Sequence, residues 1–197
     1  MTISRAASLF TVSFALLFSG IQSAKADAIF NFEADALGTR APFTDTVNGL
    51  SATFGGLASV CDSTGLFQSL SGRVLIQNLC GSSESGPLTI SFSSTLTGIS
   101  FNFANAGGTS TLTLAAFENT TPVGTATFTS TLPPGRFNGE GLANFSGTFN
   151  RLTLTSGALL ALDNINASTT AVPEPTSFAT IAAGLTLLAA FARKRKR

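Results

Sequence analysis

The amino-acid sequence predicts an all-β fold, an antiparallel β-sandwich, and three observations support this prediction. Short apolar or alternating stretches recur through the middle of the chain. Clusters of Gly, Pro, Asn and Ser separate these stretches about every 8 to 14 residues. No stretch of the middle region has the periodicity and capping residues of a helix. Short strands with frequent turns are typical of two packed antiparallel sheets.

The expected strands follow from local alternation. Leucine and threonine alternate at 111–114 and leucine and polar residues at 151–154, which places the leucines on a buried face and the polar groups on a solvated face. Phenylalanines at alternate positions, such as Phe30 and Phe32 or Phe101 and Phe103, are expected to form the core rather than a ligand-stacking surface. In chain order the expected strands are 29–33, 50–54, 74–77, 88–92, 99–103, 111–117, 124–129, 142–145, 149–155 and 159–165.

Residues 1–26 have the pattern of a secretory signal peptide. Arg5 supplies the positive start, residues 6–20 form an apolar stretch, and Ala24-Lys25-Ala26 is a small-x-small cleavage site for signal peptidase. A short buried core helix is the alternative interpretation. We expect the mature protein to begin near Asp27.

The exported part of the chain contains two cysteines, Cys61 and Cys80. An even number of cysteines in an oxidising compartment favours a disulfide. The bond would close a loop of about 20 residues and stabilise the fold by roughly 3 kcal/mol. Two buried free thiols or a metal-binding pair remain as alternatives.

The C-terminal residues have three parts with separate physical roles. Pro173-Glu174-Pro175 favours an extended, accessible segment, because proline fits neither a helix interior nor a central strand. The apolar run 178–192 predicts a short transmembrane helix, although about 20 residues are usual for a full span. Five basic residues follow and are expected to stop the chain on the cytoplasmic side of the inner membrane. They are Arg193, Lys194, Arg195, Lys196 and Arg197.

This tail resembles the PEP-CTERM sorting signal of Gram-negative bacteria, which combines Pro-Glu-Pro, a short transmembrane helix and an Arg-rich end. The resemblance implies that an exosortase, a membrane-embedded cysteine transpeptidase, cuts the tail near Pro173, Glu174 and Pro175. It also implies an association with exopolysaccharide and the biofilm matrix. A permanent membrane anchor is the alternative. The expected domains are a signal peptide (1–26), a β-sandwich ectodomain (27–168) and a sorting tail (169–197).

The order of motifs between the two ends resembles the β-sandwich ectodomain of PEP-CTERM proteins, which is similar to jelly-roll carbohydrate-binding modules. The ending Ala-Leu-Asp-Asn-Ile at 161–165 is the clearest element of this resemblance. Jelly rolls often pair their first and last strands and share a structural calcium between them. Glu33 and Asp163, with Asn164 beside Asp163, are therefore candidate calcium ligands. A hydrogen-bonded aspartate at the sheet edge is the alternative interpretation.

Composition excludes several classes of function. The chain contains no His, Trp or Tyr, which removes histidine-based triads, tyrosine acids and imidazole metal sites. Between residues 27 and 172, four arginines stand against nine carboxylates, so the net charge is −5. A mildly acidic domain without a basic patch argues against nucleic acid binding.

From these observations we predict a non-catalytic exported protein of the cell surface or extracellular matrix. One alternative is a carbohydrate-binding module, although such modules usually hold sugars with Trp or Tyr, which are absent. A second alternative is a glycoside hydrolase, which needs two carboxylates. The candidate carboxylates, otherwise interpreted as solvated turn acids, are Asp35, Asp45, Asp62, Glu84, Glu118 and Glu140.

Overall fold

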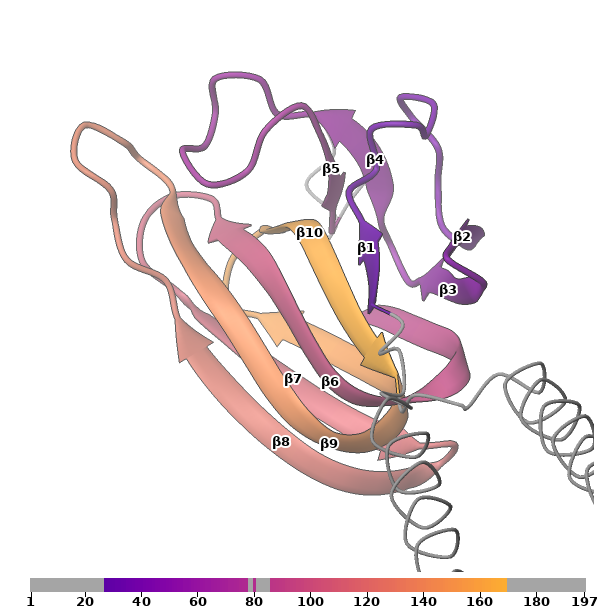
Figure 1. The fold of residues 1–197 in the computed structure, drawn as a ribbon. Helices are drawn as coiled ribbons and strands as arrows, with labels where there is room; N and C mark the ends of the chain where they lie inside the picture. Colours follow the sequence, from indigo (N-terminus) through magenta and orange to yellow (C-terminus); the bar gives the residue numbers. More distant parts are fainter. Residues whose placement is uncertain (1–26, 78–79, 81–85, 170–197) are drawn as a thin grey trace, which may run out of the picture. The chain divides into compact units, whose positions relative to one another are not determined.

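The computed structural model describes residues 27–77, 80 and 86–169, and their regular structure consists of strands (Figure 1). The all-β prediction is therefore confirmed. No helix in this described part of the chain is long and apolar enough to cross a membrane. The predicted signal peptide and transmembrane helix lie outside the described residues. The strands are β1 (Asp27–Phe30), β2 (Phe43–Val47), β3 (Leu50–Gly55), β4 (Ser59–Asp62), β5 (Arg73–Ile76), β6 (Leu88–Asn105), β7 (Thr111–Glu118), β8 (Thr121–Thr129), β9 (Gly139–Ser156) and β10 (Leu160–Thr169).

Two long strands, β6 and β9, form the centre of the fold. Each is 18 residues long, and they pair antiparallel from Leu88↔Leu154 to Asn105↔Gly139. The sequence predicts two short strands in place of each, so this expectation was wrong. Polar residues and glycines near Gly98 and Gly147 interrupt the apolar alternation, but the backbone stays extended there and absorbs the change as shifts of register.

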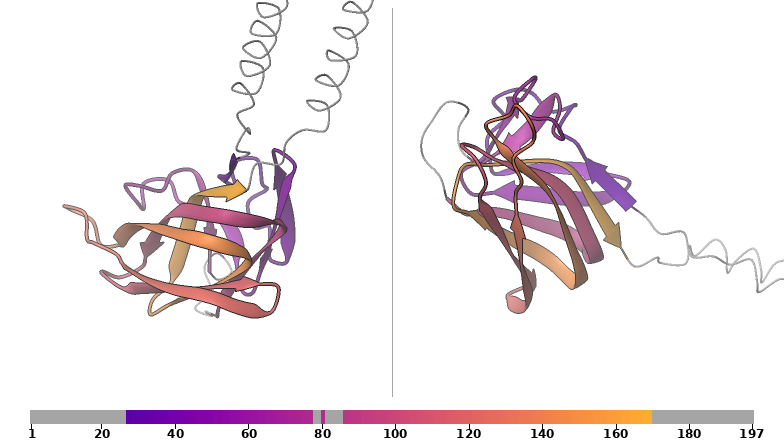
Figure 2. Two further views of the ribbon diagram at one scale, coloured as in Figure 1. Left: turned by 60° about the horizontal axis from the view of Figure 1, so that its bottom comes forward. Right: turned by 90° about the vertical axis from the view of Figure 1, so that its left-hand side faces the viewer.

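The two halves of β6 have different partners on their second edge. Residues 89–92 pair with β3, whereas residues 96–105 pair with β10. The strand order β4-β5-β10-β6-β9-β7-β8 is thus one curved sheet, with β1 on β10 and the β2–β3 hairpin on β6 (Figure 2). Phe30 of β1 and Phe54 of β3 meet edge to face across the interior, with ring centroids 6.2 Å apart. The part of the sheet that carries β1 therefore packs against the part that carries β3, and the two parts form the layers of a sandwich.

The core consists of aromatic and aliphatic side chains from both layers. Phe101 and Phe103 on β6 are buried, as are Phe30 and Phe32 near β1, so the prediction that alternating phenylalanines form the core is confirmed. Leu152 and Leu154 on β9 are also buried, while Thr153 and Thr155 between them are more accessible. This alternation matches the pleat of a strand with one face in the core.

Strands β2 and β4 were not predicted. In β2, the pattern Phe-Thr-Asp-Thr-Val contains few apolar residues because the strand lies at an edge and pairs only with β3. Asn48 and Gly49, with φ of +51° and +79°, form the turn between β2 and β3. Asn-Gly is the strongest short hairpin signal, and it could have located this strand.

The predicted disulfide between Cys61 and Cys80 is present. Its two Cα atoms are 5.9 Å apart, within the range that a disulfide spans. Cys61 lies on β4, at the far edge from β8 in the strand order. The bond therefore ties the segment that follows β5 back to an edge strand.

Replacing Phe149 with alanine is expected to lower the free energy of unfolding by about 3–5 kcal/mol. Its side chain is 0% exposed, so the change leaves a cavity in the core. The matched change Phe137→Ala removes the same atoms from a side chain that is 88% exposed, and should cost no more than about 0.5 kcal/mol. Urea denaturation of both variants measures the difference. Equal losses would contradict the placement of Phe149.

Candidate functional site

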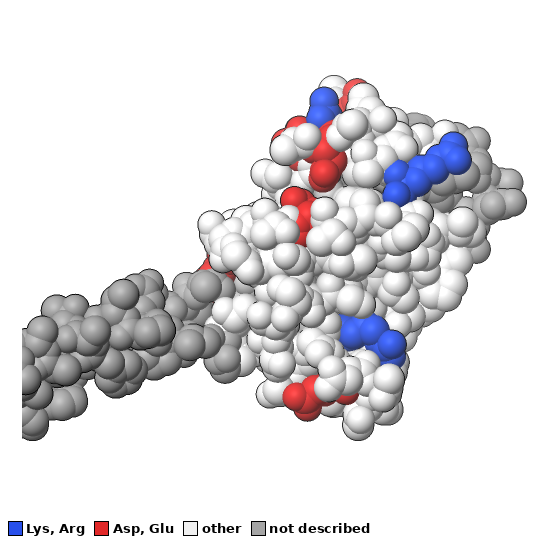
Figure 3. All heavy atoms as spheres, turned by 90° about the vertical axis from the view of Figure 1, so that its right-hand side faces the viewer, with Lys and Arg blue, Asp and Glu red and all other residues white. Residues whose placement is uncertain are grey.

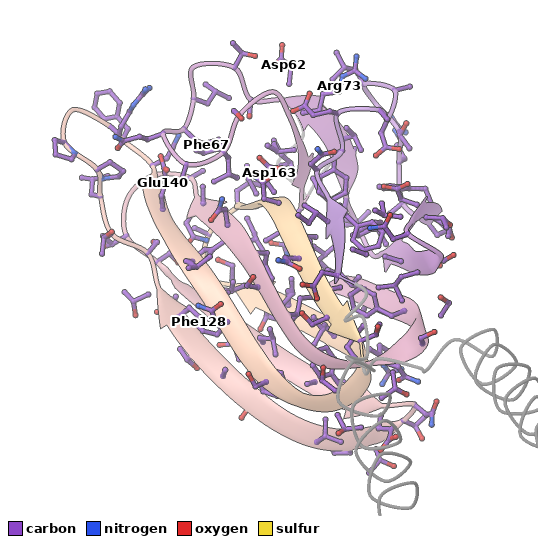
Figure 4. All side chains as sticks on the ribbon, viewed as in Figure 1. Asp62, Phe67, Arg73, Phe128, Glu140 and Asp163 are labelled. Carbon is purple, nitrogen blue, oxygen red and sulfur yellow. A yellow bond between two sulfur atoms is a disulfide. The ribbon has the colours of Figure 1, made fainter. Side chains whose placement is uncertain are left out.

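Three adjacent strands present polar side chains that hold the loop between β4 and β5, residues 63–72. Glu140 comes from β9, Asn102 from β6 and Asp163 from β10. Asp163 lies directly opposite Asn102, and Glu140 opposite Ala104, so all three side chains leave the same face of the sheet. This is the face away from the main core. Figure 4 shows Glu140 and Asp163 beside the loop that carries Phe67.

Glu140 is the most fully engaged of these groups. Its Oε1 accepts a hydrogen bond from the Gln68 amide at 2.6 Å, and its Oε2 accepts bonds from the Ser69 amide at 2.6 Å and the Ser69 hydroxyl at 2.5 Å. Burial opposes ionisation, but the hydrogen bonds from Ser69 and Gln68 and the charge of Arg136 hold the pKa of Glu140 below its ordinary value. The sequence predicts a solvated turn acid here, which was wrong because the carboxylate is buried and bonded.

Asp163 holds the other end of the same loop from a bulge in β10. Its Oδ2 accepts a hydrogen bond from the Ser71 amide at 3.3 Å. Asn164, with φ of +52°, bends back so that its own amide donates to Asp163 Oδ1 at 2.7 Å. Burial, together with the nearby negative charge of Glu33, outweighs these bonds and raises the pKa of Asp163 to about 6.

Glu33 binds the residues next to this loop. Its Oε1 accepts a hydrogen bond from the Arg73 amide at 3.1 Å, and Arg73 Nη1 donates to the Glu33 carbonyl at 3.0 Å. Gly72 lies against this carboxylate with φ of +66°, and a Cβ atom there would stand 2.1 Å from Glu33 Oε1. A glycine is therefore required for the loop to pass the carboxylate.

The two candidate calcium ligands thus converge on neighbouring backbone amides. Strands β1 and β10 are paired, as the resemblance implies, although β1 ends at Phe30 and Glu33 follows in a turn. Calcium takes six to eight oxygen ligands. In the described residues, no group of three or more His, Cys, Asp or Glu could hold a metal ion. Glu33 and Asp163 are accounted for as loop anchors, and a calcium site stays a prediction.

The other candidate carboxylates are mostly separate. Asp62 accepts bonds from its own turn at Thr64, and Glu118 is exposed at the end of β7. Burial raises the pKa of Asp35, the charge of Asp45 raises it further, and Arg73 opposes both effects. Asp35 and Asp45 are therefore close enough to interact. Glu84 lies outside the described residues.

The comparison with protein families gives a match in the C-terminal tail of the chain. Residues 171–196 match the family model described as the PEP-CTERM protein-sorting motif. The chain carries a PEP-CTERM sorting motif. This motif implies an exported protein that an exosortase sorts to the cell envelope or surface, and it agrees with the resemblance of Pro173, Glu174 and Pro175 and of the basic end. These residues lie outside the part of the chain that the structure describes.

The comparison with solved structures gives distant similarities. Two mutants of CBM29-2, from a study of ligand recognition by family 29 carbohydrate-binding modules, are 14% and 13% identical to this chain. The alignments cover 74% and 73% of this chain and 92% of those chains, with TM-scores of 0.36. At these scores the similarity carries no argument about ligands. No curated protein matches this chain.

Asn102 is a contributor that sequence reasoning missed. Its Nδ2 donates to the Ser69 carbonyl at 3.3 Å, between the contacts of Glu140 and Asp163. A polar residue between Phe101 and Phe103 fits a solvated strand face equally well, so the pattern gives no signal for a loop contact. The three anchors bind loop residues that lie between 33 and 92 positions away in the sequence, which no local pattern reveals.

We expect the stability contribution of Asp163 to fall as pH rises. Its folded-state pKa of about 6 lies above the ordinary value of 3.8, so the folded protein binds more protons than the unfolded chain between these pH values. The contribution of the neutral carboxyl is complete below about pH 4 and is lost as pH approaches about 6. Asp163→Asn keeps an uncharged acceptor and should remove up to about 3 kcal/mol of this loss.

Thermal unfolding of the wild type and Asp163→Asn at pH 4.5 and pH 7, both in a chelator, measures this effect. The stability of the variant relative to the wild type should rise from pH 4.5 to pH 7. A difference between the two proteins that is the same at both pH values would contradict the buried-acid assignment. Calcium added in excess over the chelator tests the metal prediction, because a bound ion would raise the wild-type Tm at pH 7 and leave that of Asp163→Asn unchanged.

Proposed function

We propose that this protein is a non-catalytic component of the cell surface or extracellular matrix that associates with exopolysaccharide. The observation that carries the proposal is the PEP-CTERM sorting motif at 171–196, because it directs an exported domain to the exosortase. A compact β-sandwich between residues 27 and 169 supplies a stable exported unit. The predicted signal peptide at the N-terminus supports the same route.

The roles of the acidic side chains support a non-catalytic domain. A general acid or base must be free to exchange a proton with a substrate. Glu140 is instead occupied by three hydrogen bonds from one loop, and Glu33 and Asp163 accept backbone amides. These carboxylates stabilise the fold, and the chain has no histidine or tyrosine to replace them in catalysis.

A glycoside hydrolase is the second candidate function, and one observation favours it. Asp35 has a raised pKa, interacts with Asp45, and has one carboxylate oxygen buried without a hydrogen-bond partner in the described structure. A pair of neighbouring carboxyl groups, one of them with a raised pKa, is the arrangement that such enzymes use. Asp35 is also adjacent to Arg73, whose Nη1 donates to the Asp35 carbonyl, so a structural role explains its position equally well.

Exosortase processing predicts a defined change in mass. Protein isolated from its native envelope should have a mass that begins near Asp27 and ends near Pro175, with or without an attached group. Replacing Pro173-Glu174-Pro175 with three alanines should leave residues 178–197 on the chain. Intact-mass spectrometry distinguishes the two forms. A wild-type mass that retains the basic end would mean a permanent anchor and would remove the main support for a matrix role.

Association with exopolysaccharide is tested in the same cells. The wild-type protein should co-fractionate with extracellular polymer, and a strain that lacks the polymer should release the protein into the medium. Incubation of the purified chain with the polymer should produce no new reducing ends. Release of reducing ends that disappears in Asp35→Asn would contradict the non-catalytic proposal and favour the hydrolase.

A further inference from the structure

The loop between β8 and β9, residues 130–138, lies beside the β4–β5 loop at one end of the sandwich (Figures 1 and 2). This end is opposite to the one at which the described chain ends. Gly139, which follows the loop, pairs with Asn105 at one limit of the β6–β9 ladder. Ser168, near the end of the described chain, pairs with Gly98 near the middle of β6 and with Asp27 of β1. The loop therefore lies near the Asn105 end of β6, away from the described C-terminus.

The residues on either side of Phe137 are fastened to the facing loop. Arg136 Nη1 donates to the Gly65 carbonyl at 2.7 Å, and Asn138 Nδ2 donates to the Leu66 carbonyl at 3.3 Å. Asn138 Oδ1 also accepts the Gly107 amide at 3.2 Å. The facing loop is itself held by Glu140. Both neighbours of Phe137 are thus fixed by contacts that do not involve Phe137.

Phe137 is left in solvent by this arrangement. It is 88% exposed, more than any other large apolar side chain in the described structure. The preceding Pro133-Pro134-Gly135 turn, closed by the Arg136 amide on the Pro133 carbonyl at 3.1 Å, restricts the backbone further. Because the backbone on both sides of Phe137 is already restricted, the loop loses little conformational entropy when the ring binds a ligand.

The apolar surface that these two loops expose is small. Leu66 in one loop and Leu132 in the other are each about half exposed, and with Phe137 they expose roughly 300 Å² in all. A stable protein interface needs about 800 Å² from each partner, so the patch is too small for one. Insertion of Phe137 into a membrane is also disfavoured, because exposed polar residues of the same two loops, such as Thr131 and Ser69, would lose their contact with water.

Charge at this end indicates an uncharged ligand. Residues 130–138 contain no carboxylate, and the positive charge of Arg136 acts on the ionised Glu140 beneath it. The two charges offset each other. Figure 3 shows the side of the molecule away from this loop, where the acidic and basic side chains lie among a majority of uncharged residues. A strongly anionic polymer would find no unbalanced positive group here.

We propose that Phe137 is a stacking platform for a pyranose ring of a neutral polysaccharide, on the hydroxyl- and amide-bordered end formed by residues 65–69 and 130–138. This inference rests on the proposed association with exopolysaccharide and adds the contact site and ligand class. A pyranose ring has an apolar C–H face of about the size of one phenyl ring and hydroxyls around its edge. Phe137 supplies the apolar face, and neighbouring polar groups replace the hydroxyl or N–H that Tyr or Trp would carry.

The test is affinity electrophoresis of the purified full-length chain in gels that contain dextran, β-1,3-glucan, galactomannan or, as an anionic control, alginate. The wild type should be retarded by at least one neutral polymer. Phe137→Ala should weaken that binding about tenfold, and Phe137→Trp should retain or strengthen it. Leu37→Ala is the matched control, because Leu37 is 55% exposed in a different loop and should leave retardation unchanged. The urea midpoint of each variant shows that the fold is intact.

Several outcomes would overturn the proposal. Binding that survives Phe137→Ala unchanged would place the glycan elsewhere and leave the proposed function standing. Retardation by alginate alone would exclude a neutral ligand. No retardation by any neutral polymer, together with co-fractionation in cells, would reject this site and keep the function, whereas failure of both would reject the two together. Flotation with phosphatidylethanolamine–phosphatidylglycerol vesicles, lost in Phe137→Ala, would assign the ring to a membrane instead.

Discussion

The pairing of β6 with β9 is the interaction on which the rest of this structure depends. Every other strand is attached to one of these two strands directly or through one or two neighbours. Because both strands continue through the shifts of register near Leu96, each contributes side chains to both layers of the sandwich. The two layers are therefore connected through the unbroken strands β6 and β9, and the core lies between the layers.

The polar side chains of Asn102 on β6, Glu140 on β9 and Asp163 on β10 bind the β4–β5 loop and hold it against the sheet. Leu70 of the β4–β5 loop packs with Val74, Ala104 and Ala161 in a cluster separate from the main core. Glu140 and Asp163 accept hydrogen bonds from this loop and hold it over the cluster. Three acidic residues of this domain, Glu33, Glu140 and Asp163, thus order one loop, and that loop binds the neighbouring segment that carries Phe137.

The sequence predicts the fold class, the disulfide and the sorting motif well because each depends on local pattern or composition. Strands with a strict apolar alternation, such as β7 and β3, were located closely. Strand continuity through residues 93–98 was missed, because Ser, Thr and Gly there look like a turn although the partner strand keeps them extended. The anchoring of the loop by Glu140 could not be foreseen, since sheet topology alone brings it to Gln68 and Ser69. Phenylalanine burial was foreseen in part: Phe137 and Phe149 both stand in a Gly-x-Phe-Asn sequence, but only Phe149 begins an expected strand, and of the two only Phe149 is buried.

The position of β10 has a consequence for the order in which the chain can fold after export. This strand is the last to emerge, yet it lies between β6 on one edge and β5 and β1 on the other. The N-terminal strand, which would emerge first, has no ladder partner other than β10. Contacts between such distant segments form late, because the intervening chain must be ordered first. The domain therefore remains incomplete, with β1 unpaired, until residues 160–169 are available to pair, and the sorting motif at 171–196 follows these residues directly in the chain.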